Sequence, residues 1–263
     1  MASLSARPLP GLPEIDTGHD LAALIVEALD GEAPRAGQLV AIAHKAVSKA
    51  EGAVVDLADV RPSPRAVELA LAPEGGQAKD PRAVQVVLEQ SAEVLRAERG
   101  VLVCRTHHGF VCANAGVDAS NAAPEHGEQL VLLPRDPDAS ARGIRARLRE
   151  LTGWQSSDGV APAVLISDSF GRAWRHGQVD VALGLAGLHP LDDWRGRTDA
   201  AGMELRATWL AVADAAAAAA DLARAKDSRE PVVLIDGLER FVTEEDGPGA
   251  VALLRALSED LFR

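Results

Sequence analysis

The chain has 263 residues, of which 47% are hydrophobic and 25% charged, and its formal net charge at pH 7 is -12. This length permits one large domain or two closely packed ones, and the hydrophobic share is that of a folded chain rather than a disordered one. A pI near 5.0 argues against a general nucleic-acid binder, because phosphate backbones bind basic surfaces; an anionic ligand would need local positive groups or a metal.

The predicted elements begin with a Pro- and Gly-marked loop and an amphipathic helix over 20–31, with Asp20 as its cap and Gly31 as its stop. Residues 38–57 then predict a strand, a polar turn ("AHKAVSKAEG") and a short element rich in small residues. Two helices opened by Ser-Pro and Asp-Pro follow over 63–72 and 80–98, since proline at the first helical position loses no hydrogen bond.

A hairpin over 100–116 comes next, and residues 132–153 predict a capped helix. The apolar run 161–168 predicts a strand, and the alanine-rich part of 204–225 a helix. A strand over 231–237 and a helix over 249–262 close the chain. Strands and helices mix without a regular beta-alpha-beta period, so we predict an α+β fold, with residues 1–263 forming a single functional unit.

If His108 forms the tip of the hairpin, Cys104 and Cys112 face each other across its strands. A disulfide is then geometrically conceivable, but no leader segment or membrane span is recognisable, so we expect a cytoplasmic protein with reduced thiols. A zinc site built from these cysteines with His107 or His108 is a minor alternative, because the usual C-x2-C spacing is absent.

Two aspartates follow apolar segments, Asp118 in "FVCANAGVDASN" and Asp168 in "VLISDSFGRAW". Carboxylates suit hard divalent cations that bridge phosphates, and the hydroxyl of Ser169 is a further candidate ligand. Each aspartate alone is equally compatible with a helix cap or an Asx-turn. Together, and near the polar residues Asn114, Asn121, Arg172 and Arg175, they favour a metal site. Phosphate-binding loops of the Walker and dinucleotide types are absent from the sequence.

Basic residues supply candidate partners for an anionic substrate. Lys45 and Lys49 are placed to meet phosphate oxygens, although a solvated turn explains them as well. Arg172 and Arg175 are candidates for clamping a carboxylate or phosphate, and the alternative is that Arg175 stacks on Trp174.

Seven segments, in this order, carry a family resemblance: "LPEIDTGHDL", "AHKAVSKAEG", "KDPR", "HGFVCANAGVDASN", "LLPRDPDASA", "ISDSFGRAWRHGQVDVALGLAGLHPL" and "DWRGRTDAAGMEL". The chain resembles the coenzyme F420-0:L-glutamate ligase family, also called gamma-glutamyl ligases. The resemblance implies a homodimeric, GTP-dependent enzyme that adds L-glutamate to coenzyme F420-0 through an acyl phosphate and extends it by gamma linkage. It also implies Mn2+ or Mg2+, with K+ as a further cation, and a family-specific fold of two intimately packed subdomains with mixed or antiparallel sheets and flanking helices.

By this resemblance Asp118, Asp168 and Ser169 match metal ligands, and with Arg172 and Arg175 the two aspartates are our candidate catalytic residues. The positions that match guanine-nucleotide contacts are Leu12, Pro13, Glu14, Ile15, His44, Lys49 and Asn121. His44 departs from the small hydroxyl residue that is usual at this position in the family. Lys226 departs from the Glu or Gln of archaeal members and suggests the variant found in the ligase half of bacterial two-domain forms. We expect no C-terminal flavin reductase domain. A non-catalytic nucleotide- or cofactor-binding homologue, or an amide ligase for another carboxylate, is the alternative.

Overall fold

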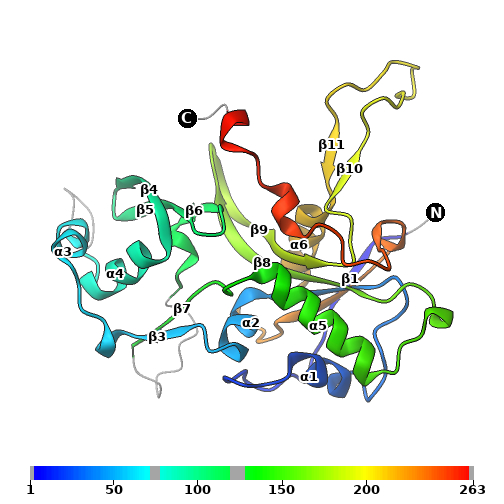
Figure 1. Cartoon of the computed structure of the whole chain (residues 1–263), viewed down its shortest axis with the longest axis horizontal. Helices are drawn as coiled ribbons and strands as arrows, with labels where there is room; N and C mark the ends of the chain where they lie inside the picture. Colours follow the sequence, from blue (N-terminus) through cyan, green and yellow to red (C-terminus); the bar gives the residue numbers. More distant parts are fainter. Residues whose placement is uncertain (1–2, 72–77, 119–127, 261–263) are drawn as a thin grey trace.

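The computed structural model describes residues 3–71, 78–118 and 128–260 of the chain. A five-stranded sheet forms the centre of its larger part (Figure 1). In spatial order its strands are β1 (Ser5–Pro8), β12 (Val232–Asp236), β2 (Leu39–Ala43), β8 (Ala163–Arg172) and β9 (Arg175–Ala186). β2 and β8 run parallel and the other neighbours antiparallel, so the sheet is mixed and the predicted α+β class is confirmed.

Helices cover both faces of this sheet (Figure 1). One face packs against α1 (Leu21–Ala28), α2 (His44–Ala50) and α5 (Pro137–Leu151), and the other against α6 (Val212–Ala223). Because side chains alternate along a strand, Val40 and Ile42 enter the first layer while Leu39 and Ala41 enter the second. A strand buried on both faces must be apolar throughout, which explains the unbroken run of β2.

Side-chain caps start two of these helices, and the predicted start of α1 at Asp20 is confirmed. The Asp20 carboxylate accepts a hydrogen bond from the amide of Ala23 at 3.1 Å, and Asp136 accepts one from the amide of Ala139 at 2.9 Å. Each cap satisfies an amide that the first helical turn leaves unpaired. Pro137 follows Asp136 in the first turn of α5, where its missing amide costs nothing.

A smaller part lies beside the sheet and holds three antiparallel strands packed against two helices (Figure 1). These elements are α3 (Pro64–Ala70), α4 (Pro81–Glu89), β4 (Ser91–Glu98), β5 (Val101–Thr106) and β6 (Val111–Ala113). The pair of β3 (Val54–Asp56) and β7 (Gln129–Val131) links it to the sheet. Phe110 meets Phe170 of β8 edge-on with 6.2 Å between ring centroids, so apolar side chains join the two parts.

A hairpin-like arm, β10 (Leu191–Asp193) with β11 (Trp209–Ala211), projects from the sheet layer (Figure 1). Short 3-10 turns complete the description at Leu57–Asp59, Asn114–Gly116, Ser156–Asp158, Glu239–Phe241, Ala250–Leu253 and Leu257–Glu259. None of the helices described is long and apolar enough to cross a bilayer.

Four predictions about elements are wrong. The predicted polar turn at 44–50 is α2, whose Ala46 and Val47 pack into the core under a polar outer side. The helix predicted over 80–98 ends at Glu89, because 91–98 pairs with β5 and the ladder overrides helix propensity.

The helix predicted over 249–262 is two 3-10 turns in its described part, since the Asp138 carboxylate fixes the amide of Ala250 at 2.7 Å. The strand predicted over 161–168 continues to Arg172, so Asp168 lies inside β8 rather than at its end, because β8 and β9 form a long hairpin that was not predicted.

Candidate functional site

Helix α2 brings together acidic residues from three distant segments. It starts directly at the end of β2, and its lysines reach carboxylates of other segments, whereas His44 and Ser48 are buried. The following contacts result: His44 Nδ1 lies 3.2 Å from Asp168 Oδ1, Lys45 Nζ lies 2.7 Å from Asp118 Oδ2, and Lys49 Nζ lies 2.5 Å from Glu14 Oε1. Residues about 35, 70 and 125 positions apart in sequence therefore meet at one seven-residue helix.

Asp118 and Asp168 approach the same turn of α2, because their partners, Lys45 and His44, are consecutive residues. Both carboxylates are partly accessible, with 34% of the Asp118 side chain and 17% of the Asp168 side chain exposed. Burial raises the pKa of the Cys112 thiol to about 12, and the nearby negative charge of Asp168 adds to this. Asp168 thus lies beside β6, the strand that leads to Asp118 along the chain.

His44 is buried, with 2% of its side chain exposed. Its Nδ1 faces Asp168, while Nε2 has no hydrogen-bond partner in the part of the chain that the structure describes. The contact of the imidazole orients the Asp168 carboxylate, which also accepts a hydrogen bond from the Ser169 amide at 2.7 Å.

Ser169 points to the other side of the sheet. Successive side chains of a strand face opposite ways, and their contacts show this: Asp168 meets α2, whereas the Ser169 hydroxyl donates to Asp180 Oδ1 at 2.6 Å. Lys226, which follows α6, donates to the same hydroxyl oxygen at 2.7 Å. The structure therefore places Asp118 and Asp168 each in contact with the first turn of α2, and Ser169 in a separate cluster.

The residues matched to nucleotide contacts are only partly gathered. Glu14 reaches Lys49, which places the 12–15 loop against α2. Ile15 is buried at 5% exposure and Leu12 packs against the same core, so their side chains stabilise the loop, whereas Pro13 is exposed. Asn121 lies outside the described residues.

Arg172 and Arg175 lie at the tip of the β8–β9 hairpin, where they pair across the strands. Both are exposed, and Arg172 donates to the backbone carbonyl of His176 at 2.6 Å. At about 3.3 Å per strand residue, the Cα of Arg172 is roughly 13 Å from that of Asp168. The arginines thus form the outer end of the candidate site.

Sequence reasoning missed a buried carboxylate. Asp180 is 2% exposed and accepts hydrogen bonds from Ser167, Ser169 and Arg224. The sequence did indicate this buried aspartate, because Asp180 occupies an inward position in the alternating strand pattern "QVDVALGLA". A buried aspartate requires such partners, since an unpaired charge is costly away from water.

The three residues predicted to bind a divalent ion differ in how well they suit that role. The described residues contain no group of three or more His, Cys, Asp and Glu side chains placed to hold one ion. Asp118 and Asp168 nevertheless suit Mg2+ or Mn2+, which often take one or two protein carboxylates and complete their shell with water and phosphate oxygens. Ser169 does not fit, because its hydroxyl is already held between Asp180 and Lys226.

The cysteine prediction is confirmed in its geometry. Cys104 and Cys112 are cross-strand partners in β5 and β6, and both are buried free thiols. Nε2 of His107 contacts the carbonyl of Glu89 at 3.0 Å, so this ring is engaged with the backbone rather than with the thiols. Across the described ranges nothing supports the zinc alternative.

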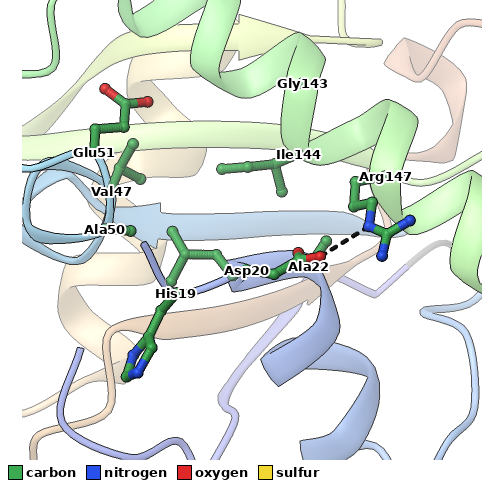
Figure 2. Close-up of a pocket in the computed structure, with 10 residues that line it drawn as sticks. His19, Asp20, Ala22, Val47, Ala50, Glu51, Gly143, Ile144 and Arg147 are labelled. Carbon is green, nitrogen blue, oxygen red and sulfur yellow. Dashed lines mark hydrogen bonds and ion pairs between the residues drawn. The ribbon is translucent and has the colours of Figure 1, made fainter. Parts of the chain in front are cut away.

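An open pocket of about 200 Å³ lies between α1, α2 and α5. In Figure 2 its apolar lining separates Glu51 from Arg147, and Arg147 donates to the Asp20 carboxylate at 2.8 Å. Its lining residues are His19, Asp20, Leu21, Ala22, Val47, Ala50, Glu51, Gly143, Ile144 and Arg147. No residue matched to metal or nucleotide binding is among them, so the pocket is separate from the candidate site.

Comparisons with known proteins match one family along nearly the whole chain. The family model for F420-0:Gamma-glutamyl ligase matches residues 11–237. A protein of Methanopyrus kandleri named coenzyme F420:L-glutamate ligase is 41% identical over 265 residues, which cover 100% of this chain and 99% of the relative. Proteins of the same name from Methanothermobacter thermautotrophicus and Halobacterium salinarum are each 42% identical over 263 residues, covering 99% of this chain and 99% and 96% of the relatives.

Proposed function

The chain belongs to the F420-0:gamma-glutamyl ligase family, and from that premise we propose that it joins L-glutamate to coenzyme F420-0 in coenzyme F420 biosynthesis. The observation that carries this proposal is identity above 40% over essentially the full length of relatives that bear the ligase name. The contacts of Asp118 and Asp168 with a lysine-bearing helix support this proposal.

We further propose GTP as the co-substrate. A carboxylate needs a better leaving group before an amine can displace it. The F420-0 carboxylate oxygen would attack the γ-phosphorus, the bond to the bridging oxygen would break, and GDP would leave. The glutamate nitrogen would then attack the acyl carbon, lose a proton and release phosphate as the amide forms. A divalent ion, Mn2+ or Mg2+, held by Asp118 and Asp168 would offset negative charge on the transferring phosphoryl group.

The protein groups have distinct roles in this scheme. Lys45 and Lys49 present ammonium groups along α2, one turn apart, and each lies beside a carboxylate that limits its motion. On this basis we assign them to phosphate oxygens as point charges. His44 orients Asp168, and the 12–15 loop, fixed by Glu14 and Lys49, borders the nucleotide. Asn121 remains a predicted contact of the nucleotide.

The outer end of the site suits the acceptor. Arg172 and Arg175 each carry a guanidinium that matches a carboxylate or phosphate in bidentate fashion, and both are exposed at the hairpin tip. We propose that they hold F420-0 or its growing glutamate tail. A homodimer, a cytoplasmic location and a requirement for K+ stay predictions of the family resemblance.

The replacement Asp168→Asn tests the assignment. It keeps the size of the side chain but removes the charge that would bind the ion, so we expect turnover to fall about a hundredfold to a thousandfold, as when a charge-stabilising group is lost. The assay mixes protein, GTP, Mn2+, L-glutamate and F420-0 and detects added glutamyl units by mass spectrometry. Asp193→Asn, at an exposed aspartate of the arm, is the matched control.

Unchanged turnover in Asp168→Asn, with the control also active, would refute the metal assignment. If the native chain binds GTP but yields no glutamylated product, the non-catalytic alternative replaces the ligase. Products formed only with a different acceptor carboxylate would identify a related amide ligase.

A further inference from the structure

Lys226 is held in place although its side chain is 68% exposed. Its ammonium donates to the Ser169 hydroxyl at 2.7 Å and to Asp221 Oδ1 at 2.5 Å. Asp221 belongs to the last turn of α6, and Lys226 lies three residues beyond the end of that helix at Ala223. Two hydrogen bonds therefore fix a long side chain that would otherwise sample many rotamers in water.

The Ser169 hydroxyl has its donor and acceptor roles assigned by its neighbours. Its single proton is donated to Asp180 Oδ1 at 2.6 Å, so its oxygen accepts from Lys226. Asp180 is locked in turn, because Arg224 and the hydroxyl of Ser167 contact its other oxygen. Arg224 is itself anchored to the carbonyl of Pro231 at 3.1 Å.

This arrangement disfavours a divalent cation at Ser169. Lys226 already occupies one of the two lone pairs of the hydroxyl oxygen, and an ion at the other would lie a few ångströms from the positive charge of the ammonium. The nearby carboxylates are already compensated, since Asp180 pairs with Arg224 and Asp221 pairs with Lys226. Arg224 and Lys226 therefore already supply the positive charge that a bound ion would bring to these carboxylates.

We propose that Lys226 is a resident cation of the ligase site that binds a phosphate oxygen of the nucleotide on the Ser169 side of β8. An ammonium has three N–H donors, and Ser169 and Asp221 use two of them, which leaves one for a ligand. Asp168 faces the other side of the same strand, and β2 pairs with β8 only as far as Ser167, so a triphosphate bound at Asp168 would meet the ammonium by crossing this uncovered edge of β8. This inference rests on the proposed function, because it assumes a nucleotide at Asp168.

Manganese binding without nucleotide gives the first test, because it does not depend on turnover. Bound Mn2+ is counted by electron paramagnetic resonance during titration. Ser169→Ala is expected to leave the number and affinity of bound ions unchanged, whereas Lys226→Glu, which adds a carboxylate beside Asp221 and Ser169, is expected to add one ion. Loss of an ion in Ser169→Ala, or an unchanged count in Lys226→Glu, overturns the proposal.

Binding of GDP in the presence of EDTA gives the second test, measured by isothermal titration calorimetry. Lys226→Gln is expected to weaken GDP binding at least about tenfold, as for loss of a charged hydrogen bond, and Lys226→Arg to restore part of it. Arg206→Gln, at an exposed arginine of the arm, is the charge-matched control. Equal GDP affinity in Lys226→Gln and this control overturns the proposal. A variant Lys226→Gln that loses affinity for L-glutamate but not for GDP also overturns it.

The two sets of results separate the failure of this inference from the failure of the proposed function. If the native chain forms no glutamylated product, the ligase assignment fails while the manganese count and the GDP affinities still decide the role of Lys226. If product forms, and if Lys226→Glu leaves the manganese count and Lys226→Gln leaves the GDP affinity unchanged, the ligase assignment stands and the resident cation is refuted.

Discussion

Arg145 offers a quantitative test of the fold, because it is a charged side chain with 1% exposure. Each of its five N–H groups has an acceptor, as the structure shows: Nε meets Pro162 O, one terminal nitrogen meets Glu244 O and Asp246 Oδ1, and the other meets Ala161 O and Thr243 O. The guanidinium therefore joins α5 to the segment before β8 and to residues 243–246.

Replacing Arg145 by lysine keeps the charge but supplies three donors in place of five. At least two buried acceptors then lose their partner, and each costs about 1–3 kcal/mol. We expect the free energy of unfolding to fall by about 3 kcal/mol, which lowers the midpoint of urea unfolding by roughly 1 M at a slope of about 3 kcal/mol/M. Circular dichroism during a urea titration measures this shift.

Asp246→Asn is the control for this experiment. The Asp246 side chain is 43% exposed, and asparagine keeps a carbonyl oxygen that accepts from Arg145, so we expect a loss below about 1 kcal/mol. The reasoning is refuted if Arg145→Lys is as stable as the control. The network also explains Gly187, since a Cβ there would lie 2.2 Å from the guanidinium carbon of Arg145.

Two further predictions concern titratable groups. Burial raises the pKa of the Asp214 carboxyl, and a hydrogen bond from the Ala182 amide only partly opposes this shift. Because the pKa in the folded state lies above that in the unfolded state, the stability that Asp214 contributes is present at low pH. It is lost as the pH rises through the folded pKa. Asp214→Asn should therefore unfold at higher urea than the native chain at pH 7, with the difference shrinking below pH 4; equal midpoints at pH 7 would contradict this. With a pKa of about 12, the native Cys112 thiol should resist iodoacetamide at pH 8 and react only after unfolding, which mass spectrometry detects; alkylation at the unfolded rate would be the contrary result.

Local signals in the sequence were sufficient for much of the fold. Apolar runs predicted β2 and β12, and capping signals predicted a helix within 132–153, where α5 is found, because caps and burial patterns act within a few residues. The pattern failed at 91–98, where Ala, Glu, Leu and Arg favour a helix. There the strand is imposed by pairing with β5, and a partner contributed by the fold is invisible to propensity.

The candidate site shows the same division. The sequence singled out Asp118, Asp168 and the lysines of α2, and the structure adds which pairs meet. It did not show that Lys45, read as part of a turn, faces Asp118 across more than 70 residues of chain. Nor did it show that Asp180 is the anchor of the Ser169 cluster, because its role depends on Arg224 from beyond α6.

The pair Asp168–Ser169 shows why adjacency in a motif is a weak guide to shared chemistry. In a helix or loop, consecutive residues can point into one site, but in a strand they point to opposite faces. Asp168 accordingly meets a helix that follows β2, and Ser169 meets residues that follow α6. If both sides of β8 contact one nucleotide, its phosphates must pass over the strand, with an ion bound on the Asp168 side and a lysine on the other. Substitutions at Lys226 should then change nucleotide binding without altering the ion held by Asp168.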